Sequence, residues 1–330
     1  MKRILTIFAF AFVALVQVLF AQGAYGNNPL AHTFSIVARD PQTGDLGVAV
    51  QSHWFSVGTS VIWGEAGVGV VATQSFVNPS FGLRGLELLK QGKTPQQVVD
   101  ELLATDEGRE LRQLAILDNK GRSAAYTGKN CIPEAGHING ENFSVQANLM
   151  KYNTVWPAMA EAFNKAKGPL AERMLAALDA AQKEGGDIRG KQSAALMVFK
   201  GKGSGKVWED KIVDLRVDDS PAPLKELRRL LKVHRAYEHM NNGDLAVEKG
   251  DQNKAMEEYS AAEKMFPSNL EMKFWHAVAL VNIGRIDESL PLFKAIFARD
   301  INWKILTPRL INNGMLKVTP EQLKKILNVN

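Results

Sequence analysis

The first two thirds of the chain contain short apolar runs with the period of β-strands. Phe34, Ile36 and Ala38 alternate with their neighbours along residues 33–39, which is the two-residue period of a strand. The run PQTG then supplies turn residues, and an apolar run follows at residues 46–52, so this pair predicts a β-hairpin. Further strands are predicted at 59–63, 67–74, 113–118, 122–127, 143–149, 193–199 and 211–217.

Helical patterns come in blocks between these strands. Residues 83–91 predict one helix, and Thr94-Pro95-Gln96-Gln97 predicts the start of another, with a capping residue, a proline at the first helical position and a capping box. The apolar spacing across residues 156–184 predicts one long helical region. Strands and helices grouped in this way favour antiparallel sheets covered by helices, an α+β fold, over alternating parallel units.

The last third of the chain is helical and repeats itself. It follows a predicted linker at residues 218–223, DDSPAP. The repeat of 34 residues is typical of tetratricopeptide units, with Gly at the tight turn and small or aromatic residues where helices pack. The alternative is a generic pair of helical hairpins, which five matches in one register make less favoured. The matched pairs are Asn241 and Trp275, Gly250 and Gly284, Ala255 and Ser289, Tyr259 and Phe293, and Ala262 and Ile296.

Capping patterns mark the starts of helices in this region. Ser268 with Glu271 predicts a capping box at the second repeat. Thr319 with Gln322 predicts another at a closing helix. Two repeats are few for a stable array, so we expect this domain, residues 225–327, to lean on the first one, residues 32–218.

The N-terminus has the pattern of an export signal. Lys2 and Arg3 precede an almost wholly apolar stretch, Ile4 to Ala21, and the polar run QGAYGNN follows. This predicts a signal peptide at residues 1–24, cleaved after Ala21 or Ala24, and a periplasmic or secreted protein. A retained membrane anchor is the alternative, because 18 residues could just span a bilayer.

Composition excludes several classes of protein. The chain is 45% apolar and 23% charged, which argues against disorder. Its net charge of +5 is spread without dense clusters, so no nucleic-acid partner is expected. The single Cys131 cannot form an internal disulfide; it is either a nucleophile near His137 or a small buried side chain. His32, His53 and His137 lack the spacing of metal ligands, so neither metal nor cofactor is expected.

Thr33 is the candidate for chemistry. An N-terminal nucleophile needs a hydroxyl or thiol on the first residue, whose own free amine acts as the base. Backbone N–H groups must also face the developing oxyanion. Signal cleavage after Ala21 would leave residues 22–32 in front of Thr33. A second cut of the His32–Thr33 bond, by the protein itself or by another protease, would therefore be required.

Several runs in order resemble a bacterial family catalogued as domain of unknown function 1028. They are HTFSIVARDPQTGDLGVAVQS, GVGVVATQSFVNPSFGLRGLELL, GRELRQLAILD, AYTGKNCIPEAGH, FSVQANLM and GGDIRGKQSAALMV, and they cover about residues 32–217. The resemblance implies an N-terminal nucleophile hydrolase-like fold, the four-layer αββα sandwich of antiparallel sheets seen in the proteasome β subunit. Members of the family often begin with Met directly before the residue that matches Thr33, so that removal of Met exposes this Thr.

The resemblance also implies a site. The backbone around Gln74 and Ser75 falls where the family's oxyanion donors would lie. Proteasome-like members end the second strand with an acidic residue and carry a Lys near the end of the third. This chain has Gln51 and Ser52 at the first of these places and no Lys at the second. Further polar candidates near strand ends, each alternatively a turn or cap residue, are Asn148, Asp187, Arg189 and Ser193.

Two functions are compatible with these patterns. The first is an exported amidohydrolase or peptidase in which Thr33 cleaves an unknown small amide or peptide after removal of residues 1–32. The second is a catalytically inactive hydrolase fold that binds a protein or peptide through its helical repeats. The missing charged partners of Thr33 motivate the second hypothesis. The sequence names neither a substrate nor an oligomeric state.

Overall fold

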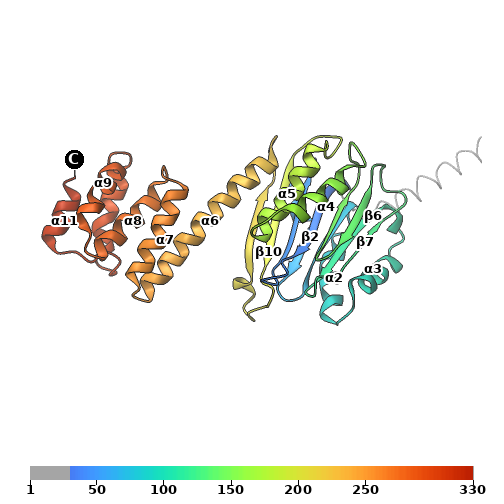
Figure 1. The fold of residues 1–330 in the computed structure, drawn as a ribbon, viewed down its shortest axis with the longest axis horizontal. Coiled ribbons are helices and arrows are strands. Elements are labelled where there is room, and N and C mark those ends of the chain that lie inside the picture. The colour runs from blue at the N-terminus through green and yellow to red at the C-terminus, as the bar shows by residue number, and fades with distance from the viewer. Residues whose placement is uncertain (1–29, 330) are drawn as a thin grey trace, which may run out of the picture. The chain divides into compact units, whose positions relative to one another are not determined.

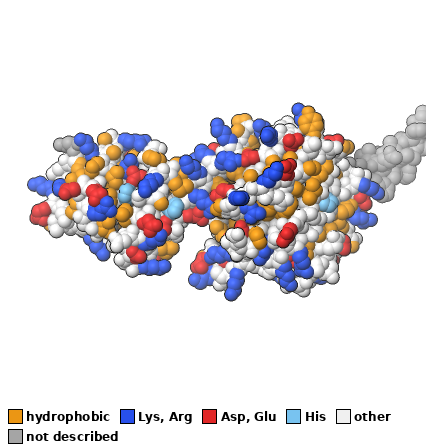
Figure 2. Space-filling model, in the orientation of Figure 1, with side chains coloured by type: hydrophobic (Ala, Val, Ile, Leu, Met, Phe, Trp, Pro, Cys, Tyr) orange, Lys and Arg blue, Asp and Glu red, His pale blue; other side chains and the backbone are white. Residues whose placement is uncertain are grey.

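The computed structural model describes residues 30–329, and the chain divides into two units after Arg228. The predicted signal peptide, residues 1–24, lies outside this range. Within residues 30–329, no helix combines the length and the apolar character needed to cross a membrane. Acidic and basic side chains are interspersed on the visible face of each unit (Figure 2).

The first unit contains two antiparallel sheets. The five-stranded sheet has the order β1-β5-β6-β7, with β4 also paired to β5. Its strands are β1 (Leu30–Ala31), β4 (Ile62–Glu65), β5 (Gly69–Phe76), β6 (Arg112–Asp118) and β7 (Ser123–Thr127). The six-stranded sheet has the order β11-β10-β3-β2-β9-β8. Its strands are β2 (Thr33–Arg39), β3 (Leu46–Ser52), β8 (Gly136–Gly140), β9 (Phe143–Ala147), β10 (Ser193–Phe199) and β11 (Lys211–Val217).

Helices cover the outer face of each sheet. Helices α2 (Ser80–Lys90) and α3 (Pro95–Ala104) contact the five-stranded sheet, and α4 (Val155–Lys165) and α5 (Leu170–Lys183) contact the six-stranded sheet (Figure 1). The sheets contact each other through β2 and β3 on one side and β5 and β6 on the other. Buried side chains fill the space between them, among them Val37, Val48, Val50, Val70, Ala72 and Ala115. The mixed α+β class with antiparallel sheets is therefore confirmed.

Three local predictions in this unit were wrong or incomplete. Residues 59–63 are not one strand, because a 3₁₀ turn at Val57–Thr59 precedes β4. The region 156–184 is two helices, because Gly168 has φ 97° and Pro169 precedes α5. Strand β8 was not predicted, since its five residues carry a glycine at each end. The capping box at Thr94 is confirmed.

The second unit is all-helical over its described residues. It contains most of α6 (Pro223–Glu248), then α7 (Gln252–Met265), α8 (Leu270–Asn282), α9 (Ile286–Phe297), α10 (Ile301–Leu306) and α11 (Pro320–Leu327). The capping box at Thr319 is confirmed. The second predicted cap was wrong by one residue: Asn269, not Ser268, accepts the backbone N–H groups at the start of α8. Asn is about as favourable as Ser at this position, because its side-chain oxygen can accept the same free backbone N–H groups.

A carboxylate on α7 ties this helix to α8. Glu263 accepts a hydrogen bond from His276 Nδ1 and lies 3.4 Å from Lys273 Nζ, and its side chain is only 16% exposed. The His276 hydrogen bond, followed by the charges of His276 and Lys273, lowers the pKa of Glu263 from its usual 4.5, against an opposing effect of burial. The contact therefore favours the ionised carboxylate in the folded state.

We predict that Glu263→Gln destabilises the helical unit by about 1 kcal/mol at pH 7. A lowered folded-state pKa stabilises above the unfolded value of 4.5, and this contribution is lost as the pH falls through the folded pKa. The difference in unfolding free energy between variant and parent should therefore vanish in acid. Hydrogen exchange of the α8 amides measures it. Glu257→Gln on the same helix, whose side chain is 71% exposed, is the control and should change little.

Candidate functional site

The chain passes from one sheet to the other at His32. Residues Leu30 and Ala31 pair with Phe76 and Ser75 of β5, so the segment before Thr33 is an edge strand of the five-stranded sheet. Thr33 opens β2 of the six-stranded sheet. Thr33 is fully buried, and its hydroxyl donates to the Ala31 carbonyl at 2.6 Å. The candidate nucleophile is therefore inaccessible to solvent and bonded to the segment that precedes it.

Two donors converge on the carbonyl group before Thr33. The His32 oxygen accepts from Ser52 Oγ at 2.5 Å and from Arg189 Nη2 at 2.9 Å. Ser52 reaches it because Thr33 and Ser52 are opposite each other in the β2–β3 ladder. A hydroxyl and a guanidinium on one carbonyl oxygen withdraw electron density from the carbon of the His32–Thr33 bond.

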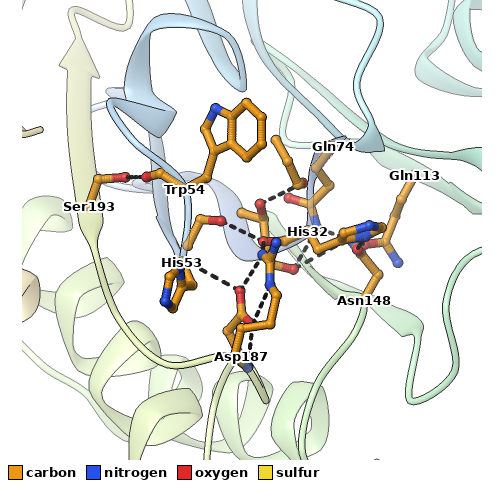
Figure 3. Close-up of polar contacts among 12 residues, drawn as sticks. His32, His53, Trp54, Gln74, Gln113, Asn148, Asp187 and Ser193 are labelled. Carbon is orange, nitrogen blue, oxygen red and sulfur yellow. Dashed lines mark hydrogen bonds and ion pairs between the residues drawn. The ribbon is translucent and has the colours of Figure 1, made fainter. Parts of the chain in front are cut away.

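A buried carboxylate orients Arg189. Asp187 Oδ1 accepts from Arg189 Nε at 3.0 Å, and Oδ2 accepts from Nη2 at 2.7 Å (Figure 3). The Asp187 side chain is fully buried, whereas that of Arg189 is 30% exposed. Asp187 Oδ2 also accepts the backbone N–H of His53 at 3.1 Å. This two-point ion pair fixes the plane of the guanidinium, in which a second N–H of Nη2 points to the His32 carbonyl.

Side-chain amides beside this carbonyl form a hydrogen-bond network. Backbone carbonyls determine which amide atoms in it donate and which accept. Gln113 Nε2 donates to the carbonyls of Ala147 at 2.9 Å and Gly136 at 3.2 Å. Carbonyls can only accept, so Nε2 is the donor end of this amide and Oε1 is its acceptor end. It accepts from Gln74 Nε2 at 2.6 Å and from Asn148 Nδ2 at 2.9 Å.

The same network immobilises the backbone of Thr33. Its carbonyl accepts from Gln74 Nε2 at 3.2 Å and from the backbone N–H of Asn148 at 3.1 Å. Gln74 Oε1 in turn accepts from Ser35 Oγ at 2.6 Å, which accepts from Gln146 Nε2 at 2.6 Å. These bonds join β5 and β6 of one sheet to β2 and β9 of the other, so both sheets fix the position of Thr33.

His32 occupies a defined place at the edge of this network. Asn148 uses its Nδ2 group as a donor, so its Oδ1, 2.8 Å from His32 Nδ1, is the acceptor and the ring carries the proton on Nδ1. The ring lies nearly perpendicular to that of Phe76, with 5.8 Å between the ring centroids. Burial lowers the pKa of His32 from 6.5, and nearby Arg189 adds to this, although the Asn148 bond opposes it. The ring is therefore neutral at pH 7.

The structure brings six of the predicted site residues together around the His32–Thr33 bond. They are Thr33, Ser52, Gln74, Asn148, Asp187 and Arg189. Gln74 contributes its side-chain amide to this site and bonds the carbonyl of Thr33, not that of His32. Asp187 and Arg189 supply the charged groups of this site.

The other predicted residues lie differently. Gln51 pairs with Phe34, one position from the Thr33–Ser52 pair, so its side chain points to the opposite face of the sheet. Neither amide atom of this buried side chain has a hydrogen-bond partner within the described part of the chain. Ser75 pairs with Ala31 and has φ 71°, a left-handed conformation beside the candidate site. Ser193 holds the loop after β3 through the Trp54 carbonyl and the Val57 N–H.

Sequence reasoning missed the centre of the amide network. Gln113, Ser35 and Gln146 are fully buried and make at least two side-chain hydrogen bonds each, but were not singled out. His32 was weighed only as a metal ligand. The available signal was a polar residue at an inward position of an apolar strand, as with Gln113 in QLAILD. Such a residue must find partners, because burial without them is costly.

Cys131 lies in a less reactive setting. Its thiol is buried, with Sγ 3.3 Å from the Arg112 carbonyl, and burial raises its pKa, so that it is protonated at pH 7. His137 Nδ1 is bonded to Thr127 Oγ1 at 2.8 Å, and burial lowers the pKa of this ring. Across residues 30–329, no three His, Cys, Asp or Glu side chains are grouped so that they could hold a metal ion.

The chain belongs to a family of unknown function, DUF1028, whose profile matches residues 33–227. It is similar to a solved structure, protein SPO2555 from Silicibacter pomeroyi, which is described as a member of the same family. The two are 32% identical with a TM-score of 0.56, over 61% of this chain and 88% of that chain. No curated protein matches. The family match begins at Thr33, the first residue of β2.

We predict that Gln113→Leu costs roughly 2–4 kcal/mol of stability, because it leaves Gln74, Asn148 and two carbonyls without their buried partner. Denaturant unfolding of the purified protein measures this loss. Gln96→Leu, at an exposed position of α3, removes an amide of the same size and should stay within about 0.5 kcal/mol of the parent. Equal stability of the two variants would mean that the network does not hold the sheets.

Proposed function

We propose that this protein is an exported hydrolase of the N-terminal nucleophile type, in which Thr33 cleaves an amide bond once residues 1–32 have been removed. The order of layers, with two facing antiparallel sheets between helix pairs, supports the αββα sandwich of that class. The observation that carries the proposal is the pair of donors, Ser52 and Arg189, on the carbonyl of His32. They bind the oxygen on which negative charge would develop.

The same donors would serve removal of the leader. The Thr33 hydroxyl adds to the His32 carbonyl carbon, and the charge on the oxygen is stabilised by Ser52 and Arg189. The C–N bond then breaks, the Thr33 nitrogen takes the hydroxyl proton, and an ester joins His32 to Thr33. Water hydrolyses this ester, which releases the leader as a carboxylic acid and leaves Thr33 with a free amine and a free hydroxyl.

Substrate hydrolysis would repeat this chemistry on another chain. The free amine of Thr33, with an ordinary pKa near 8, takes the proton of the hydroxyl as it attacks a substrate amide. The amine then passes this proton to the leaving nitrogen, and water releases the acyl group from Thr33. Gln74 and Asn148 hold the Thr33 carbonyl, so the nucleophile stays in place throughout.

We predict that Thr33→Ala abolishes cleavage between His32 and Thr33, and that Ser52→Ala slows it about 10²–10³-fold. Arg189→Lys should also slow it, because an ammonium cannot bind Asp187 at two points and still reach the carbonyl. Intact mass and N-terminal sequencing of the exported protein give the rate at which chains beginning at Thr33 appear. Ser80→Ala and Arg84→Lys, both at exposed positions, are the matched controls.

The outcomes separate self-cleavage from other routes. A Thr33→Ala protein that is still cut at this bond would point to another protease. A wild-type protein that keeps its leader, beginning at Gln22 or Tyr25, would leave Thr33 blocked and contradict the hydrolase proposal. Stability measured alongside shows whether a slow variant is merely misfolded.

A second candidate function is peptide binding by the helical unit, which we propose to be a tetratricopeptide-like domain. Gly250 and Gly284, 34 residues apart, have φ of 77° and 83° at the α6–α7 and α8–α9 turns. The repeat partners on α7 and α9 are all buried. A mainly apolar pocket, lined by Tyr259, Trp275, Asn282 and Met315 among others, favours a bound side chain.

We predict that, if this second function holds, capture of a peptide by the full chain requires residues 225–327 and weakens about tenfold in Trp275→Ala. Binding to immobilised peptide libraries measures this. Trp208→Ala, at an 80% exposed position of the first unit, is the control. Capture that survives both the Trp275 change and removal of residues 225–327 would exclude the pocket.

A further inference from the structure

We infer that residues 30–32 occupy the site of the substrate's acyl side, and that the substrate is an extended peptide with histidine directly before the cleaved bond. This inference rests on the proposed function and extends it to a substrate class. Its starting point is that the segment before Thr33 makes specific backbone and side-chain contacts at the candidate nucleophile.

The backbone contacts define an extended peptide. Leu30 and Ala31 pair with the last two residues of β5, beyond the part of the same edge that β4 covers at residues 69–72. When the leader leaves, this short stretch of β5 regains free N–H and C=O groups. An incoming chain in the same direction can pair there, as in β-strand addition. Its third residue then enters the place of His32, with its carbonyl between Ser52 and Arg189.

The side-chain contacts define the residue before the cleaved bond. In the space that the His32 ring fills, which we call its pocket, Asn148 Oδ1 accepts the Nδ1–H hydrogen bond and the Phe76 ring lies nearly perpendicular to the His32 ring. Asn148 cannot turn its amide around, because Nδ2 is held by Gln113 Oε1, whose own orientation is fixed by two backbone carbonyls. The pocket therefore presents a fixed acceptor. It favours a side chain whose N–H donor lies where the Nδ1 atom of the His32 ring lies.

This arrangement discriminates between side chains. Histidine supplies the Nδ1–H donor and an aromatic ring that packs perpendicular to Phe76. Phenylalanine has a similar shape but would leave Asn148 Oδ1 buried without a partner, which is costly. A carboxylate would face an acceptor oxygen and be repelled, and leucine would lose both contacts. The leader's own His32 thus marks the preference of the site.

The test uses the chain that begins at Thr33 and a set of peptides. Acetyl-Leu-Ala-X-aminomethylcoumarin, with X as His, Phe, Leu or Asp, gives kcat/KM for each residue before the cleaved bond. The corresponding free acids, acetyl-Leu-Ala-X, give dissociation constants by calorimetry without any chemistry. A His peptide N-methylated at both Leu and Ala tests the pairing with β5. Residue pairs in an antiparallel ladder alternate between hydrogen-bonded and non-hydrogen-bonded, so one of these two residues must use its N–H in the ladder. Methylation of both removes that N–H whichever residue carries it.

We expect the His substrate to exceed the Phe substrate by about tenfold or more in kcat/KM, and the His acid to bind tighter by a similar factor. N-methylation should abolish most of that binding. Hydrolysis at equal rates for His, Phe and Leu would overturn the pocket assignment and leave the hydrolase proposal standing. No hydrolysis of any peptide, with tight and selective binding of the His acid, would overturn the hydrolase and keep the pocket. Absence of both hydrolysis and selective binding would overturn the hydrolase proposal and the pocket assignment together.

Discussion

The arrangement around Thr33 depends on one constraint: buried amides between the two sheets must all be satisfied, and only one direction of hydrogen bonding satisfies them. Gln113 faces two backbone carbonyls, which can only accept. That fact sets its oxygen as the acceptor for Gln74 and Asn148. A reversal at any point would leave a donor facing a donor among fully buried side chains, at a cost of several kcal/mol. The direction of each hydrogen bond is therefore fixed. Because Gln74 and Asn148 bond the Thr33 carbonyl, the position of Thr33 is fixed as well.

The rigid network lies beside a polar site at the strand ends. Ser52 at the end of β3 and the Asp187–Arg189 pair from the segment before β10 supply its donors and its charge. Both donors act on the carbonyl before Thr33, whereas Gln74 and Asn148 hold the carbonyl after it. The bond between them is thus fixed at both ends, in a buried setting where each donor counts for more than in water. The edge strand β1, two residues before Thr33, pairs with the end of β5 beside this bond.

Interactions between residues close in sequence could be predicted from the sequence, whereas most contacts between distant residues could not. Local rules predicted the capping boxes at Thr94 and Thr319, because the bonds join residues three positions apart. The same rules failed at Ser268, where the neighbouring Asn269 competes as a cap, and at β8, whose short Gly-bounded run has no local signal. Six candidate site residues do meet, yet the resemblance that suggested some of them assigned Gln74 a backbone role, and its side chain makes the contact.

The sequence by itself determined the mixed class of the first unit, the helical character of the last third and the family, because hydrophobic period, turn residues and ordered motifs are local properties of the chain. Only the tertiary structure decided that Gln51 faces away while Ser52 faces Thr33, since a shift of one residue in strand register reverses every side chain. It also decided that Arg189 reaches the carbonyl of a residue 157 positions earlier. Contacts of that range arise from the packing of two sheets, and no local pattern records them.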